Sequence, residues 1–123
     1  MKKKILIIDD DADIRIGMNA RLRANGFDTA FAEDGVGAMN VAVQEKPDLI
    51  LLDIGLPGGD GFVILSRLRA NTKLACIPVI VVTARDPEDN EKRALEGGAT
   101  AFFQKPVDNQ ELLSAISSSL LQD

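Results

Sequence analysis

Carboxylates that follow two short apolar runs could act together on a phosphoryl group. Asp9, Asp10 and Asp11 come directly after the apolar residues 5–8, and Asp53 ends another such run. If both runs are neighbouring strands, each close pair of carboxylates repels by about 4 kcal/mol near a protein surface. A cation would relieve this repulsion. Because oxygen ligands with no histidine or nearby cysteine favour a hard ion, we expect Mg²⁺ rather than zinc.

A hydroxyl and an ammonium group would complete such a site. Thr83 ends a third apolar run, and Lys105 follows a fourth segment of strand-like sequence. With Mg²⁺ neutralising the phosphoryl oxygens, Lys105 would pair with the remaining charge and Thr83 would hydrogen-bond one oxygen. The combination indicates phosphoryl transfer onto a carboxylate, which gives an aspartyl phosphate. Hydrolysis of that group needs no separate base if water is admitted.

A parallel sheet would bring these residues together. Three of the apolar runs are continuous, which is typical of parallel strands buried on both faces, whereas residues 27–31 alternate as in an edge strand. The predicted strands are residues 5–8, 27–31, 49–53, 79–83 and about 100–104. A helical pattern follows each strand, so we predict a single doubly wound α/β domain, (βα)5, flavodoxin-like, with parallel strand order 2-1-3-4-5. In that order ligands bind at the carboxyl ends of strands 1 and 3.

Five amphipathic segments mark the helices. Their apolar residues are Ile14, Met18 and Leu22; Val36, Met39 and Val43; Phe62, Leu65 and Leu68; Ala94 and Leu95; and Leu112, Leu113, Ile116 and Leu120. Helix caps are predicted at Asn25, Asp86, Gly97 and Asp108. The segment 88–96 has little apolar surface, so we expect a marginal helix at the low-stability end of the domain, where moving parts are found.

Length, charge and cysteine content exclude several classes. The chain has 123 residues, a net charge of −5 and a single cysteine, Cys76, which fits one domain in a reducing compartment. No apolar run approaches the roughly 20 residues needed to span a bilayer, so we expect a cytoplasmic protein with no membrane partner. With 14 basic residues against 19 acidic ones, and neither Trp nor Tyr, nucleic acid is not an expected partner of this chain alone.

Four sequence blocks resemble the signatures of the two-component response regulator receiver domain. They are residues 5–10, 52–61, 81–84 and 104–106, and they occur in order at the family's spacing. The resemblance covers the whole chain, so residues 1–123 are expected to form one receiver domain.

The resemblance implies a role for each acidic residue. Asp53 corresponds to the phosphoacceptor. Asp9 and Asp10, together with Asp53 and the backbone carbonyl of Gly55, correspond to the ligands of Mg²⁺. The phosphoryl donor is then a phosphohistidine of a sensor kinase or phosphotransfer protein.

The resemblance also implies a switch. Thr83 and Lys105 correspond to the family's switch residues, Phe102 to its mobile aromatic position, and the Lys105–Pro106 peptide bond is expected to be cis. Apart from self-directed phosphoryl transfer and autodephosphorylation, the protein is not expected to be an enzyme. The partner is expected to be a downstream protein or an output domain, bound through the helix at 88–96, the fifth strand and the last helix.

Three features depart from the family pattern. Gly55 is unusually small beside the acceptor, and Arg85 lies two residues after Thr83. Together they leave no acid or amide to orient water, so we predict a long-lived phosphoryl group. The run 117–119 is Ser-Ser-Ser where receivers that dimerise through the last helix place basic residues, which argues against that dimer.

The same residues are compatible with other functions. Asp9-Asp10-Asp11 fits the D-x-D pattern of haloacid-dehalogenase-like phosphatases, although those need a longer chain and a later acidic pair. A phosphate-independent adaptor and a flavin carrier are further alternatives, and the flavin carrier lacks a Trp or Tyr to stack its ligand. Locally, an i,i+4 ion pair between Asp11 and Arg15 is expected.

Only one residue of the pair Phe102 and Phe103 is expected to pack in the core, with the other at the surface, because adjacent strand residues face opposite sides.

Overall fold

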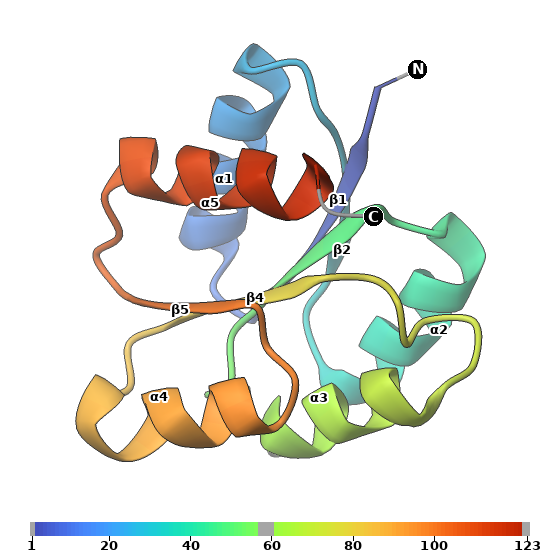
Figure 1. Cartoon of the computed structure of the whole chain (residues 1–123). Helices are drawn as coiled ribbons and strands as arrows, with labels where there is room; N and C mark the ends of the chain where they lie inside the picture. The colour runs from blue at the N-terminus through green and yellow to red at the C-terminus, as the bar shows by residue number, and fades with distance from the viewer. Residues whose placement is uncertain (1, 57–60, 122–123) are drawn as a thin grey trace.

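The computed structural model describes residues 2–56 and 61–121, which form an open sheet with helices on both sides (Figure 1). The strands in this part of the chain are β1 (Lys4–Ile8), β2 (Asp28–Ala32), β3 (Leu49–Leu52), β4 (Val79–Thr83) and β5 (Ala101–Gln104). The helices are α1 (Ala12–Ala24), α2 (Gly35–Glu45), α3 (Gly61–Ala70), α4 (Pro87–Glu96) and α5 (Asn109–Leu121). None of these helices is long and apolar enough to cross a membrane.

The sheet has the predicted order β2-β1-β3-β4-β5, and every pairing is parallel. Ile8 of β1 pairs with Leu52 of β3, so the two strands end level with each other. Thr83 of β4 is likewise level with Gln104 of β5. The residues that follow these strand ends therefore meet at one edge of the sheet.

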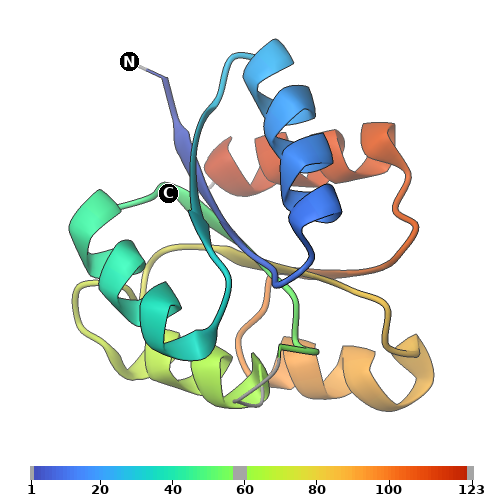
Figure 2. The same ribbon diagram turned by 180° about the vertical axis from the view of Figure 1, so that it is seen from behind.

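Two apolar layers hold the sheet in place. Helices α1 and α5 cover one face, and α2, α3 and α4 cover the other (Figures 1 and 2). In β1, Ile5 and Ile7 belong to the first layer, whereas Leu6 and Ile8 belong to the second. Because both faces are covered, every position of β3 and β4 and all of β1 after Lys4 are buried, which explains the continuous apolar runs.

The larger apolar residues of the patterns in β2 and α2 do not all face the core. Phe31 is 41% exposed while its neighbours Ala30 and Ala32 are buried, and Val36 is 77% exposed while Ala38 is fully buried. Alanines of β2 and α2 belong to the same apolar layer, so the helix approaches the strand closely. Larger side chains do not fit between them and turn outward.

Helix caps follow the sequence signals, with one correction. Asp11 caps α1 by accepting hydrogen bonds from the backbone N–H groups of Asp13 (2.9 Å) and Ile14 (3.3 Å). The expected pair between Asp11 and Arg15 was therefore wrong, since capping engages the carboxylate. Arg15 instead donates to the backbone carbonyl of Asp9 (2.7 Å) and lies 3.6 Å from the carboxylate of Glu33.

The other predicted caps are present. Asp86 caps α4, Asp108 accepts from the N–H of Glu111, and Asn25 and Gly97 end α1 and α4.

Two glycines offer a matched test of this packing. A Cβ atom at Gly61 would lie 2.2 Å from the Cα of Ile54, so we expect Gly61→Ala to lower the free energy of unfolding by about 1–3 kcal/mol. A Cβ at Gly17, inside α1, would meet nothing within 4 Å, so Gly17→Ala should raise it by about 0.5–1 kcal/mol. Urea unfolding measures both. Equal effects of the two substitutions would contradict the close approach at Ile54.

Candidate functional site

The carboxylates of Asp9 and Asp53 lie together because β1 and β3 end level with each other. Their residues are only 3% and 7% exposed, whereas Asp10 is exposed. These three side chains can each offer one carboxylate oxygen so that all three oxygens lie within 4.8 Å of one another. An all-oxygen donor set of this size and charge fits a hard divalent cation such as Mg²⁺.

Lys105 bridges the two buried carboxylates. Its Nζ donates to Oδ2 of Asp9 at 2.8 Å and to Oδ2 of Asp53 at 3.1 Å. The lysine follows β5, where its backbone N–H donates to the carbonyl of Thr83 at 2.8 Å. Its peptide bond to Pro106 is cis, as the family resemblance implied. Lys105 thus brings a positive charge from the β5 end of the sheet to the ends of β1 and β3.

The pKa shifts of this group have different causes. Burial raises the pKa of Asp9 above its ordinary value, and the hydrogen bonds from Lys105 and from the N–H of Asp11 only partly offset that rise. Burial alone would lower the pKa of Lys105, but its hydrogen bond to Asp9 and the charges of Asp53 and Asp9 outweigh burial and raise it. The lysine is therefore firmly charged at neutral pH.

One side of Asp53 is left open by a glycine. The N–H of Gly55 donates to Oδ1 of Asp53 at 2.8 Å. A Cβ at position 55 would lie 3.3 Å from that oxygen, 3.7 Å from Nε of Arg85 and 4.0 Å from Oγ1 of Thr83. The hydroxyl of Thr83 and the guanidinium of Arg85 therefore border the same space beside the carboxylate of Asp53.

The expected contrast between Phe102 and Phe103 was wrong, because both side chains are half-buried. The strand β5 is covered on both faces, so each ring finds a different apolar layer. Phe102 packs against the layer under α2, α3 and α4, and Phe103 packs against the layer under α1 and α5. Phe102 pairs with Val81, two residues before Thr83, so Phe102 and Thr83 point to the same face of the sheet.

The structure brings together the predicted residues Asp9, Asp10, Asp53, Gly55, Thr83 and Lys105 at one edge of the sheet. Sequence reasoning missed two groups that hold Asp9 in place. The N–H of Asp11 donates to Oδ1 of Asp9 at 2.9 Å, and Arg15 donates to the carbonyl of Asp9. Both contacts depend on the path of the backbone into α1, for which the residue types alone carry no signal.

The sequence of this chain matches the model of a known protein family. The family model described as response regulator receiver domain matches residues 5–117. The chain belongs to this family. Receiver domains are signalling switches rather than ordinary enzymes, they bind Mg²⁺ in an acidic pocket, and they interact with histidine kinases and downstream effectors.

Individual relatives agree with this assignment. The phosphate regulon transcriptional regulatory protein PhoB of Escherichia coli K12 is 39% identical over 118 residues, which are 96% of this receiver and 52% of PhoB. The chain thus spans about half the length of that relative. A crystal structure of a putative response regulator from Chloroflexus aurantiacus superposes with a TM-score of 0.94 at 27% identity, covering 99% of this chain and 100% of the other.

A third relative was crystallised with a metal ion. The receiver domain of the sensor histidine kinase PA1611 from Pseudomonas aeruginosa PAO1 has a magnesium ion coordinated in its active site cleft. It is 25% identical to this chain, with a TM-score of 0.90 and coverage of 99% and 100%.

Removing the bridging ammonium tests the electrostatics of this receiver. Lys105→Met leaves two buried carboxylates without their cation, so we expect the metal-free protein to lose about 1–3 kcal/mol of unfolding free energy. Because the pKa of Lys105 is raised in the folded state, its contribution is complete below its ordinary pKa of 10.5. It is lost as the pH rises through the folded value, so wild type and variant should converge there.

Urea unfolding with a metal chelator measures this difference. The control is Lys92→Met, whose side chain is 87% exposed in its pair with Glu96 and should change stability by less than about 0.5 kcal/mol. Equal effects of the two substitutions would contradict the bridging role of Lys105.

Proposed function

We propose that residues 1–123 form one receiver domain that acts as a phosphorylation-dependent switch in a cytoplasmic two-component phosphorelay. Asp53 accepts a phosphoryl group from a phosphohistidine of a sensor kinase or phosphotransfer protein, with Mg²⁺. The observation that carries this function is the position of Lys105 Nζ, which lies within 3.1 Å of both Asp9 and Asp53. A carboxylate beside a fixed ammonium and two further carboxylates suits phosphoryl transfer.

Each residue of the site has a chemical task in this function. Asp9, Asp10, Asp53 and the carbonyl of Gly55 would hold Mg²⁺, whose charge offsets that of the phosphoryl oxygens; the metal bound to PA1611 supports this role. A carboxylate oxygen of Asp53 forms the new P–O bond while the P–N bond to the donor histidine breaks and its electron pair returns to the imidazole nitrogen.

Two further side chains stabilise the product. Lys105 pairs with a phosphoryl oxygen, and the hydroxyl of Thr83 donates to another. Thr83 is only 1% exposed, so this hydrogen bond would be shielded from water.

The switch follows from the direction in which Thr83 points. Thr83 and Phe102 lie on the same face of the sheet, towards the layer that α4 closes. A movement of Thr83 towards the phosphoryl group would open space that the ring of Phe102 can fill. Since Ala94 is the buried residue of α4, this helix has little packing to resist a shift. The surface of α4, β5 and α5 would then change its affinity for a partner.

Phosphoryl transfer to Asp53 is tested directly with acetyl phosphate. Incubation with acetyl phosphate and Mg²⁺ should add one phosphoryl group by intact mass, and both Asp53→Asn and a metal chelator should abolish the addition. Asp13→Asn, which alters an exposed carboxylate at the start of α1, should label as the wild type does. Labelling of Asp53→Asn at equal stoichiometry would refute the assignment. A folded wild type that neither labels nor binds beryllofluoride would instead be a phosphate-independent adaptor.

We also propose that the phosphoryl group is long-lived. The open space at Gly55 is bordered by Arg85, and neither residue supplies an acid or amide that could orient an attacking water. After removal of the donor, the label should therefore decay with a half-life of minutes or longer. Arg85→Asn places an amide at this space and should shorten the half-life several-fold, whereas Arg67→Asn on the exposed side of α3 should not. Decay of the wild type within seconds would disprove the idea.

A further inference from the structure

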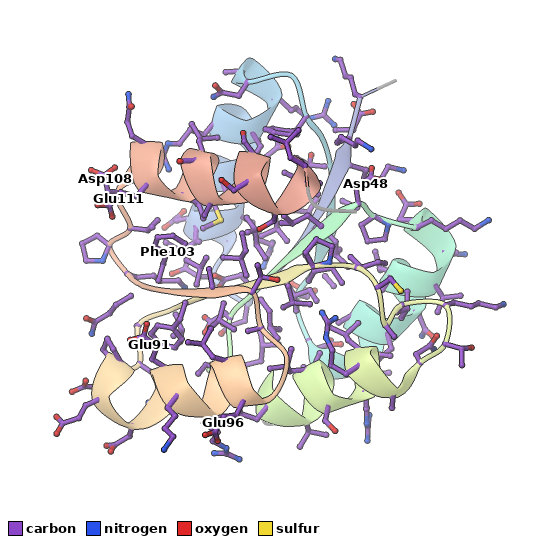
Figure 3. The ribbon with its side chains drawn as sticks, in the orientation of Figure 1. Asp48, Glu91, Glu96, Phe103, Asp108 and Glu111 are labelled. Carbon is purple, nitrogen blue, oxygen red and sulfur yellow. The ribbon has the colours of Figure 1, made fainter. Side chains whose placement is uncertain are left out.

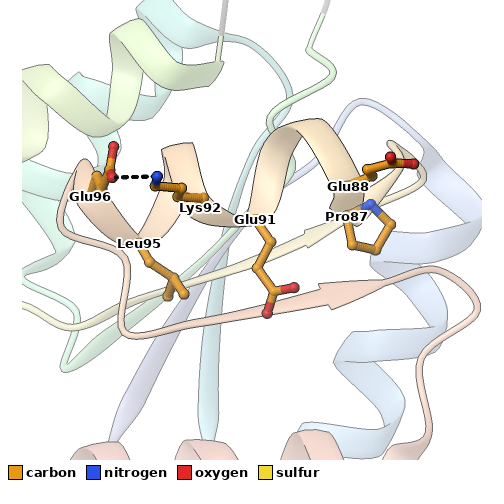
Figure 4. Close-up of a pocket in the computed structure, with 6 residues that line it drawn as sticks. All are labelled: Pro87, Glu88, Glu91, Lys92, Leu95 and Glu96. Atoms are coloured by element: carbon orange, nitrogen blue, oxygen red, sulfur yellow. Dashed lines mark ion pairs between the residues drawn. The ribbon is translucent and has the colours of Figure 1, made fainter.

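A shallow groove of about 500 Å³ lies on the outer side of α4 (Figure 4). It is lined by Pro87, Glu88, Glu91, Lys92, Leu95 and Glu96. Leu95 is 43% exposed, a large apolar side chain with no covering element in this part of the chain. In Figure 4, Leu95 and Glu91 project to the side on which β5 runs. The groove therefore combines an apolar floor with carboxylates at its rim, on the helix that packs least.

The surroundings of the groove are acidic on both sides of β5. Glu91 lies on the α4 side, and Asp108 and Glu111 lie at the start of α5, with Phe103 between them (Figure 3). All three carboxylate residues are exposed. Neither β5 nor α5 carries a lysine or arginine. Figure 3 thus shows Phe103 of β5 with the carboxylates of Glu91, Asp108 and Glu111 on either side of it.

The basic residues nearest to this surface do not balance its carboxylates. Lys92, which also lines the groove, lies 3.8 Å from the carboxylate of Glu96 (Figure 4), so the lining has three carboxylates against one ammonium. The guanidinium of Arg93 stacks on the ring of Phe62 at 3.9 Å, which places it towards α3. Lys105 donates into the phosphoacceptor site. The face of α4, β5 and α5 therefore presents net negative charge to an approaching partner.

We infer that this groove binds a basic amphipathic segment of another protein and does not bind a second copy of this chain. In a two-fold dimer through this face, each acidic residue would meet the same acidic surface of the partner, and like charges in contact are destabilising. A segment with lysines or arginines around a large apolar side chain would neutralise the excess of carboxylates over Lys92 in the groove while its apolar group covers Leu95. The opposite charges would also speed association.

The preference of the groove for a positively charged segment follows from the residues that line it. Regulation of the groove by phosphorylation rests on the proposed function, whereas the charge preference does not. The occupant is a segment of a separate effector protein.

Two synthetic peptides test this inference on the full chain. One is an amphipathic 14-residue helix of leucine and lysine, and the other has glutamate in place of every lysine. Amide chemical shifts of the isotopically labelled protein are followed with and without beryllofluoride and Mg²⁺. The lysine peptide should shift amides of α4 and β5 and bind more weakly as salt is added. The glutamate peptide should shift none of them.

Charge reversal supplies the matched control. Glu91→Lys with Glu96→Lys should weaken binding of the lysine peptide at least tenfold. Asp13→Lys with Glu45→Lys makes the same change in net charge on α1 and α2 and should leave binding within about twofold. Sedimentation should show a monomer before and after addition of beryllofluoride.

The outcomes that overturn the inference are specific to the groove. Equal binding of the two peptides, equal loss of binding in both double variants, or a beryllofluoride-induced dimer that perturbs the amides of α4 and β5 would each disprove it. Failure of the proposed function shows separately, as absence of any beryllofluoride response around Asp53, while peptide binding to α4 can still be measured.

Discussion

The structure depends on one electrostatic constraint, the placement of two buried carboxylates at the ends of adjacent parallel strands. The register that pairs Ile8 with Leu52 leaves Asp9 and Asp53 no means of separating. Their repulsion is offset by the ammonium of Lys105, which reaches them from the carboxyl end of β5. The hydrogen bond from the N–H of Lys105 to the carbonyl of Thr83 fixes the chain after β5 and so positions this ammonium. A shift in the register of β1, β3 or β5 would separate the cation from the carboxylates, because these strands carry Asp9, Asp53 and Lys105 at their ends.

The central strands that carry the carboxylates are tightly packed, whereas α4 is packed loosely. The central strands are buried on both faces, so the carboxylates are held by the best-packed part of the molecule. The helix α4 contributes Ala94 to the core and leaves most of its surface to solvent. A charge added at the rigid strand ends therefore meets the least resistance where α4 packs. Because of this difference in packing, a change of charge at the strand ends would displace α4 more easily than the central strands.

Much of the fold and of the site could be predicted from residue types, and the exceptions have physical reasons. Continuous apolar runs identify central parallel strands because both of their faces are buried, and polar residues after such runs must share one edge. The exposure of larger apolar residues in β2 and α2 was not predicted, because a close approach between alanines excludes larger side chains, and no periodicity reports that distance. The partner of Arg15 was mispredicted because a cap competed for Asp11. The hydrogen bonds that the carboxylate and the backbone carbonyl of Asp9 accept from Asp11 and Arg15 have no counterpart in the sequence pattern.

The same physical chemistry gives this chain two properties that family membership alone does not. With a glycine at position 55, no Cβ stands 3.3 Å from Oδ1 of Asp53, and the guanidinium of Arg85 borders that space. A guanidinium attracts the phosphoryl oxygens but takes no proton from water, which favours persistence of the modified state. On α4, the carboxylates around Leu95 oppose pairing with a like surface. If the phosphoryl group persists as proposed, the acidic surface of α4 would keep the modified receiver available to a basic partner, because like charges oppose contact between two copies.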